Sequence, residues 1–381
     1  MLWGLAAYDP LDPTVMSPSD GISWLGLQMA TTATVTLYNF QTFRHIMDPG
    51  WTIVVDLMPN APYNQQFANC CKGGEVSAWG QDPAASISQF QITVGLAGTS
   101  NKTVKLPKNF TLLGPGPGYT CGPAKLVPST KFLTPDGRRK TQALLTWNVT
   151  CTYSQFLARK NPNCCVSFSS FYNQEITPPC PTCACGCQNN NTCINRDSKI
   201  LKVVEANNSK RENTSLLQCT HHMCPIRVHW HVKVNYKEYW RVKIAIVNFN
   251  YRMNYSVWSL VIQHPNLNNV TQVFSFNYQP LIPYESINDT GMFYGMKYYN
   301  DVLMQAGPLG NVQSEVLLQK DLNTFTFKQG WAFPRKVYFN GDECMLPPPD
   351  TYPFLPNSVH GSLISFLTLT SAWFSLLIFL S

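Results

Sequence analysis

Residues 228–237 read Val-His-Trp-His-Val-Lys-Val-Asn-Tyr-Lys, so apolar and polar side chains alternate over ten positions. Successive side chains of a strand point to opposite faces, so this period of two predicts one buried face and one solvated face. The apolar positions continue beyond Glu238 at Trp240, Val242, Ile244 and Ile246. We therefore predict a β domain over residues 219–346, with further strands at 256–263, 271–276 and 324–327.

Shorter strand-like segments precede this domain, at residues 31–37, 51–57, 87–96, 109–113 and 143–151. Proline and glycine separate them, most clearly in Gly114-Pro115-Gly116-Pro117-Gly118, which predicts a loop. We predict one β-sandwich over residues 8–160.

Composition favours the same fold class. The 381 residues include 28 prolines and 13% aromatic residues, which disfavour helices. Only 13% are charged, which excludes a coiled coil or a charged disordered chain. The net charge of +7 is mild and predicts no nucleic-acid partner. The predicted fold is all-β: two β-sandwich-like domains joined by a Cys-rich segment, residues 161–218, with a C-terminal hydrophobic tail.

Fourteen cysteines indicate disulfides and a secretory route. Five of them crowd the junction, at Cys180, Cys183, Cys185, Cys187 and Cys193. Zinc binding by this cluster is the alternative, but zinc sites usually pair Cys-x-x-Cys arms at a defined separation, so we predict no metal and no cofactor. Asn-x-Ser/Thr sequons predict N-glycosylation at Asn101, Asn109, Asn148, Asn190, Asn207, Asn213, Asn254, Asn269 and Asn288.

Both ends are interpreted as targeting signals, and for the N-terminus an ordinary disordered start is the alternative. Residues 1–7 are interpreted as a signal-peptide remnant, with Gly4 and Ala6 matching the small-residue rule for cleavage. At the other end, a Pro-rich spacer over residues 347–358 precedes a tail over 359–381 that is free of charge from Gly361 onward. This order predicts attachment of a glycosylphosphatidylinositol (GPI) anchor. A single membrane span and a buried core helix are the alternatives.

Sequence patterns give no catalytic residue. There is no Gly-x-Ser-x-Gly elbow, and scattered acids such as Glu75, Asp82 and Glu175 cannot be paired from sequence alone. Aromatic rings can stack on sugar rings without a catalytic group, and Trp51, Trp79 and Trp258 are candidate glycan-stacking residues.

The odd positions of the alternating stretch are basic. They are Arg227, His229, His231, Lys233, Lys237, Arg241 and Lys243. Such a face could attract acidic polysaccharide or lipid headgroups. The simpler interpretation is a solvated strand face, which also accounts for His229 and His231 better than metal binding does.

Cys164-Cys165-Val166-Ser167 is the signature of the COBRA family of plant wall proteins, which the chain resembles from about residue 37 to 358. Other matching strings are Cys70-Cys71-Lys72-Gly73-Gly74, Trp79-Gly80-Gln81-Asp82-Pro83, His221-His222-Met223-Cys224-Pro225 and Gly341-Asp342-Glu343-Cys344. The resemblance implies a secreted, N-glycosylated protein held on the outer plasma-membrane face by a GPI anchor, with Asn357 at the attachment position. It also implies an N-terminal carbohydrate-binding module that contacts cellulose, and a role in cellulose deposition and oriented cell expansion.

The chain departs from the family pattern in one internal place. Several tens of residues normally separate a segment like Pro49-Gly50-Trp51-Thr52 from one like Val54-Val55-Asp56-Leu57, and here they are absent. The N-terminal domain is thus predicted to be shortened near residues 52–54, with a shifted register or a lost strand. We expect a non-catalytic glucan-binding protein of the cell surface. The alternatives are a hydrolase or transferase that remodels wall polysaccharide, and a structural partner of the cellulose-synthesising machinery.

Overall fold

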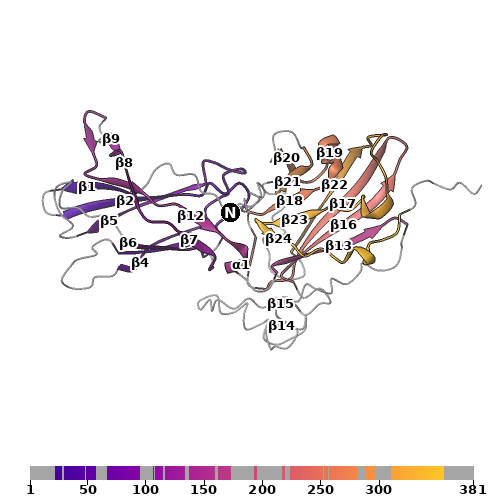
Figure 1. Ribbon diagram of the computed structural model, residues 1–381, viewed down its shortest axis with the longest axis horizontal. Helices are drawn as coiled ribbons and strands as arrows, with labels where there is room; N and C mark the ends of the chain where they lie inside the picture. Colours follow the sequence, from indigo (N-terminus) through magenta and orange to yellow (C-terminus); the bar gives the residue numbers. More distant parts are fainter. Residues whose placement is uncertain are drawn as a thin grey trace, which may run out of the picture.

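A computed structural model shows two β domains placed end to end (Figure 1). It describes residues 22–27, 30–47, 49–56, 67–94, 106, 108–114, 116–133, 137–158, 162–172, 193–194, 217–218, 224–281 except 252 and 256, 288–296 and 310–355. The one α-helix among these residues, α1, is the four-residue Gln155–Ala158. The all-β prediction is confirmed.

The N-terminal domain has two main sheets. The larger has the order β5 (Ile87–Val94), β2 (Ala30–Tyr38), β1 (Ile22–Leu27), β11 (Thr146–Asn148), β8 (Lys125–Val127). The smaller has the order β4 (Phe67–Gly73), β3 (Trp51–Asp56), β6 (Lys108–Leu113). Two short pairs complete the domain: β12 (Cys151–Tyr153) with β7 (Tyr119–Cys121), and β10 (Lys140–Gln142) with β9 (Lys131–Leu133).

The predicted shortening falls inside strand β3. This strand is continuous from Trp51 to Asp56 and pairs with a neighbour on each side. Its register against β4 is irregular between Ile53 and Val55, and against β6 between Val54 and Asp56. The described structure thus keeps β3 central in its sheet, with a register that is displaced locally on both sides.

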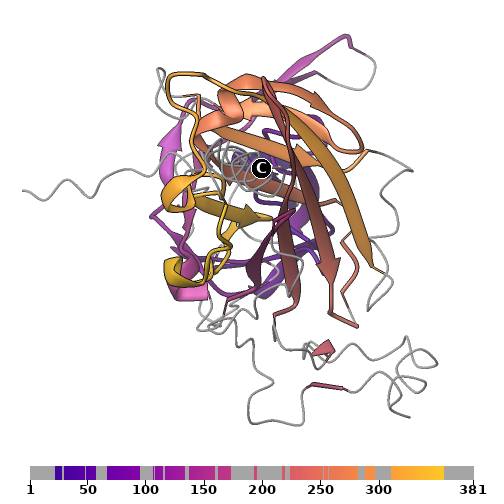
Figure 2. The same cartoon turned by 90° about the vertical axis from the view of Figure 1, so that its right-hand side faces the viewer.

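The C-terminal domain is a sandwich of two five-stranded sheets, seen from its outer end in Figure 2. One sheet has the order β13 (Cys164–Ser170), β16 (Ile226–Asn235), β17 (Tyr239–Asn248), β22 (Asn311–Gln319), β19 (Val270–Val273). The other has the order β20 (Asn277–Leu281), β21 (Thr290–Tyr294), β18 (Ser259–Gln263), β23 (Lys336–Phe339), β24 (Asp342–Glu343). A separate pair joins β14 (Cys193–Ile194) to β15 (Leu217–Gln218).

The alternating stretch forms β16 and β17, and its predicted buried face is confirmed as far as Val232 and again from Trp240 to Ile246. Val234 and Tyr236, predicted on the same buried face, are partly exposed and 46% exposed respectively, since the register shifts between Val232 and Val234. The apolar residues from Val228 to Val232 and from Trp240 to Ile246 are buried, and the residues between them are partly exposed. At the centre of this core, His264 stacks on Trp230 at 5.7 Å and lies 5.3 Å from Trp240. Its Nδ1 accepts a hydrogen bond from Asn266 N, and its Nε2 lies 2.8 Å from the Trp331 carbonyl oxygen.

The domain boundaries differ from the predicted ones. Residues 164–170 form the edge strand of the C-terminal sheet rather than part of the Cys-rich junction, because β13 pairs in parallel with β16. The predicted spacer is also packed as far as Leu355, which is buried, and Tyr352 contacts Phe168 at 4.8 Å. The strand predicted at 324–327 is wrong. Phe325 and Phe327 instead lie in a turn and its following coil and pack on Trp240.

Several predicted features lie outside the described residues: residues 1–7, most of the Cys-rich segment, and the tail from residue 356. Within the part that the structure describes, no helix is long and apolar enough to cross a membrane.

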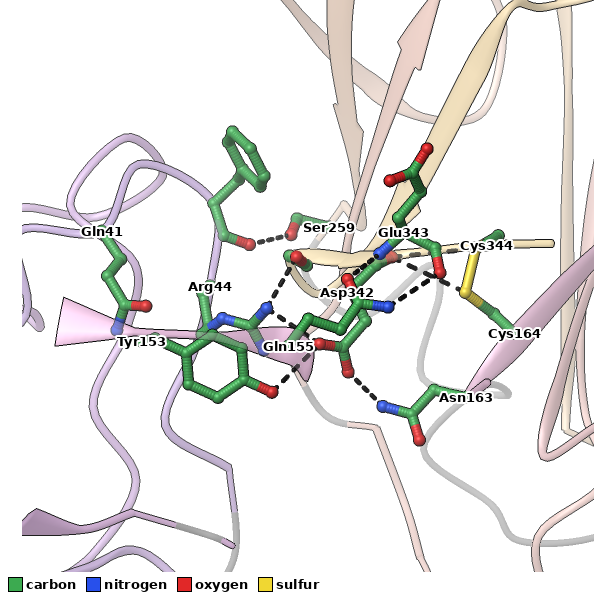
Figure 3. A network of polar contacts seen from close by, with 12 residues as sticks. Gln41, Arg44, Tyr153, Gln155, Asn163, Cys164, Ser259, Asp342, Glu343 and Cys344 are labelled. Atoms are coloured by element: carbon green, nitrogen blue, oxygen red, sulfur yellow. Dashed lines mark hydrogen bonds and ion pairs between the residues drawn. A yellow bond between two sulfur atoms is a disulfide. The ribbon is translucent and has the colours of Figure 1, made fainter. Parts of the chain in front are cut away.

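A buried polar network joins the two domains (Figure 3). Arg44 Nη2 lies 2.8 Å from Asp342 Oδ1 and donates to the Gly341 carbonyl oxygen at 2.6 Å. Tyr153 and Asn163 also donate hydrogen bonds to the Asp342 carboxylate. Burial alone would lower the pKa of Arg44, but the combined attraction of Asp342, Tyr153 and Tyr119 outweighs it and the pKa is raised. Arg44 therefore stays charged in the interface.

Other contacts reinforce this junction. Ser259 Oγ donates to the Phe43 carbonyl oxygen at 2.7 Å, and the Gln155 side chain bonds to both the N–H and the C=O of Glu343. Gly341 has φ +83°, and a Cβ there would lie 2.8 Å from Arg44 Cβ, so glycine suits both its backbone and the close approach. The two domains thus meet through ordered, specific contacts and not only through the chain that links them.

Candidate functional site

The outer face of the β2–β5 pair carries no charge, because neither strand contains a charged residue. Tyr38 lies opposite Ile87 and Thr36 lies opposite Gln89 in the antiparallel register, so these side chains share one face. Ile87 and Gln89 are exposed, whereas Val35 and Leu37 point into the core.

Three aromatic side chains form a row at the end of this face, which we call the aromatic row: Tyr38, Phe40 and Trp79. The rings of Tyr38 and Phe40 are nearly parallel, with centroids 5.5 Å apart and an interplanar angle of 8°. Trp79 follows at 5.1 Å from Phe40, tilted by 47°. Its side chain is 39% exposed, and Tyr38 and Phe40 are partly exposed.

The motif Trp79-Gly80-Gln81-Asp82-Pro83 fixes the position of Trp79. The backbone N–H groups of Trp79 and Gly80 donate to the carbonyl oxygens of Gln41 and Thr42, each at 3.0 Å. A Cβ at Gly80 would lie 2.3 Å from the Thr42 carbonyl oxygen, so only glycine permits this approach. Asp82 Oδ1 then accepts from the N–H groups of Ala84 and Ala85 and closes the turn.

A buried polar layer supports the row from below. His45 Nδ1 accepts a hydrogen bond from Ala78 N at 2.9 Å, and burial lowers the pKa of His45 to about 4. Asn39 Nδ2 donates to the carbonyl oxygens of Arg44 and Ser77, and Gln41 donates to Asn39 Oδ1. These bonds hold the aromatic row on an ordered backbone.

The structure corrects two of the three predicted stacking residues. Trp51 is 1% exposed and packs on Phe90 at 5.5 Å, and Trp258 is 2% exposed and packs on Phe276 at 4.9 Å. Both are core residues whose ring faces are covered by protein. Sequence analysis missed Tyr38 and Phe40, although the alternation of Leu37, Tyr38, Asn39 and Phe40 could have placed the two rings on one face.

The signature Cys164-Cys165-Val166-Ser167 lies in β13, and each residue has a different role. Cys164 forms a disulfide with Cys344, and Val166 lies in the core. Cys165 is buried and forms no disulfide with another described cysteine. Ser167 Oγ lies 2.7 Å from His229 Nδ1 on the outer face.

The predicted glycosylation sites are only partly within the described residues. Asn109 and Asn254 are exposed, and Asn148, Asn269 and Asn288 are partly exposed. Asn101, Asn190, Asn207 and Asn213 lie outside the described residues.

A second disulfide, Cys121–Cys151, joins β7 to β12.

The site presents aromatic faces, amides and a hydroxyl, which are groups that can bind a ligand. Among the described residues, no group of three or more His, Cys, Asp or Glu side chains lies close enough to hold a metal ion.

The fold and this surface define a two-domain, disulfide-bonded β protein with an uncharged aromatic face. The chain belongs to the COBRA family: the COBRA N-terminal domain matches residues 52–154 and the COBRA family C-terminal domain matches residues 163–353.

Similar proteins cover nearly the whole chain. It is 66% identical to COBRA-like protein 4 of Arabidopsis thaliana over 408 residues, which covers 96% of this chain and 94% of that protein. It is 56% identical to Protein COBRA of the same plant, over 95% of this chain and 89% of that protein. A solved chitin-binding domain of a chitinase from Pyrococcus furiosus aligns with 31% of this chain and 99% of that domain, at 15% identity and a TM-score of 0.20, a likeness too small to carry an argument.

Proposed function

We propose that this chain is a non-catalytic, GPI-anchored protein of the cell surface that binds cellulose or related glucan chains through the aromatic row. It would thereby act in cellulose deposition and oriented cell expansion in the plant cell wall. Membership of the COBRA family supports a wall-related role. The observation that carries the proposal is the ordered, partly exposed row of Tyr38, Phe40 and Trp79 on an uncharged sheet face.

The chemistry of this face suits a neutral sugar polymer. Glucan chains present flat faces of C–H groups that stack on aromatic rings, and hydroxyl groups at their edges that bond to amides. Tyr38 and Phe40 supply two nearly parallel rings in sequence, and Gln89 and Thr36 supply polar groups beside them. A glucan chain lying across the aromatic row would stack successive sugar units on successive rings, and no charged group would take part in these contacts.

Binding to crystalline cellulose tests this proposal directly. Trp79→Ala and Tyr38→Ala should each weaken binding about five- to tenfold in depletion isotherms, since an aromatic contact contributes roughly 1 kcal/mol beyond its buried area. Tyr172→Ala is the matched control, because Tyr172 is 59% exposed on the other domain. Unchanged binding in both row variants, or an equal loss in the control, would refute the aromatic row as the site.

A further inference from the structure

The outer face of the C-terminal sheet is strongly basic. Its five strands contain a single acidic residue, Glu315 on β22. The outward side chains of β16 and β17 form what we call the basic face: Arg227, His229, His231, Lys233, Arg241 and Lys243. The sheet face thus carries four permanent cations on β16 and β17 and a single carboxylate, on β22.

Glu315 is shared by two of these cations. It bonds to Lys233 and lies 3.1 Å from Arg241 Nη1, and the hydrogen bond from Lys233 lowers the pKa of Glu315. Lys243 lies opposite both Glu315 and His231 in the register. Burial and then the charges of Lys243 and Lys233 lower the pKa of His231. The face therefore has a positive potential that one carboxylate does not cancel.

Polar side chains order the histidines of this face. Ser169 Oγ bridges His229 Nε2 at 2.8 Å and His231 Nδ1 at 2.7 Å, and Ser167 Oγ holds His229 Nδ1. The two imidazole rings are nearly parallel, at 19°, with centroids 6.4 Å apart. The two histidines of β16 are thus held in a fixed orientation between the cations.

The face ends in an open depression of about 410 Å³ at the turn between β16 and β17. Tyr236, Lys237, Tyr239, Arg241 and Leu317 line it together with Glu238. Tyr236 is 46% exposed. An aromatic ring beside a guanidinium and an ammonium group suits a sugar that carries an acidic group.

We propose that the basic face binds a carboxylated polysaccharide, which lies along β16 and β17 with a sugar ring against Tyr236. Outward side chains repeat about every 7 Å along a strand. Such a row of cations and histidines matches a linear polymer with regularly spaced carboxylates better than a single anion. A membrane surface is disfavoured, since membrane-bound faces present apolar groups for insertion and the outward residues of β16 from Arg227 to Lys233 are all polar.

Titration calorimetry with polygalacturonate, using the full folded chain, tests the proposal. Polygalacturonate should bind, and the affinity should fall steeply as salt rises because the contacts are ionic. Fully methyl-esterified polygalacturonate has the same backbone without the charges and should bind at least tenfold more weakly. Equal binding of both polymers would overturn the proposal.

Charge-reversal variants locate the site. Lys243→Glu should lower the affinity for polygalacturonate about tenfold, and Tyr236→Ala about fivefold. Lys125→Glu makes the same change of net charge at an exposed residue of the other domain and should have little effect. An equal loss in Lys125→Glu would show a non-specific charge effect and overturn the assignment. Cellulose binding should be unchanged in all three, which separates this site from the aromatic row.

A second readout does not depend on a variant. A bound polyanion should raise the pKa of His231, since a nearby negative charge favours the protonated imidazole. The charges of Lys243, Lys233 and Glu315 act on His231, and His229 and Arg241 lie on the same face. Only the ligand adds charge on binding. An unchanged imidazole titration in NMR spectra at saturation would overturn the proposal. So would strong binding to phosphatidylserine vesicles that polygalacturonate does not displace, which would identify a membrane site.

Discussion

His264 is enclosed by Trp230, Trp240 and Trp331, and burial lowers its pKa from 6.5 to about 3. The native state therefore holds this imidazole neutral, whereas the unfolded state protonates it below about pH 6.5. The unfolded state binds more protons between these two values, so stability rises with pH in this window. The stabilising contribution of the neutral His264 is fully present above about pH 6.5 and is lost as the pH falls toward 3.

We predict that the free energy of unfolding falls by about 4 kcal/mol between pH 7 and pH 3 on account of His264. His264→Gln should be less stable at pH 7, because it loses the bonds to Asn266 and Trp331, but it should show a weaker dependence on pH. Urea denaturation at pH 7 and pH 4.5 measures both effects. The same dependence on pH in the variant and the wild type would contradict this explanation. His45→Gln should likewise weaken the dependence on pH, because burial also lowers the pKa of His45, to about 4.

The Asp342 carboxylate accepts contacts from Arg44, Tyr153 and Asn163 at the domain interface. Asp342→Asn would leave Arg44 as a buried cation without its counter-ion, and both side chains are only 8% exposed. We expect a loss of about 3 to 5 kcal/mol in the free energy of unfolding. Glu315→Gln removes the carboxylate of a more exposed ion pair and should cost about 1 kcal/mol or less. Similar losses in the two variants would show that the interface pair contributes no more than a surface pair.

Individual residues show where sequence reasoning stops. Trp51, Trp79 and Trp258 are the same residue type, and local sequence cannot tell which of them the fold covers. Trp51 and Trp258 are buried by residues distant in sequence, Phe90 and Phe276. The partner of Cys164 could not be predicted either, because Cys344 lies 180 residues away and meets it only after both sheets have formed.

At the scale of elements, strands with a regular pattern were predictable and irregular ones were not. β17 follows a period of two throughout and β16 does so up to Val232, so these buried faces were clear from the sequence. β22 was missed, although Val312, Val316 and Leu318 point inward, because a buried Ser314 interrupts the apolar positions. β13 was missed because residues on both of its faces are buried, and Cys-Cys-Val-Ser then shows no alternation.

β13 lies at the edge of its sheet and depends on a covalent link. It pairs with β16 on one side, and on the other it makes one isolated bridge, between Cys165 and Met345. The Cys164→Ser, Cys344→Ser double variant should lose about 2 to 5 kcal/mol of stability. Hydrogen exchange should increase most in β13 and β24, since the disulfide joins their ends. Exchange that increases evenly over both domains would contradict a local role.

At the scale of the whole molecule, the proposed anchor makes a separate prediction. If the tail is replaced by a GPI lipid at Asn357, a phosphatidylinositol-specific phospholipase should release the protein from intact cells. Asn357→Trp, which blocks attachment by its bulk, should abolish release and retain the protein inside the secretory route. Protein that stays on the membrane with residues 363–381 still attached would refute the anchor.

The Cys164–Cys344 disulfide also determines how the molecule would carry mechanical load. The N-terminal domain enters the second domain at Asn163, just before Cys164. After Cys344 the chain packs on the sandwich as far as Leu355, and once that short segment is pulled away the disulfide is the next point of attachment. A pulling force between a glucan fibre and the cell surface would therefore pass from Cys164 to Cys344 through the two sulfur atoms. The sandwich formed by the residues between Cys164 and Cys344 would lie in a loop closed by the disulfide and would bear no tension. In single-molecule stretching, the loop should add about 60 nm of contour length only after reduction, and a gain of that length with the disulfide intact would disprove this load path.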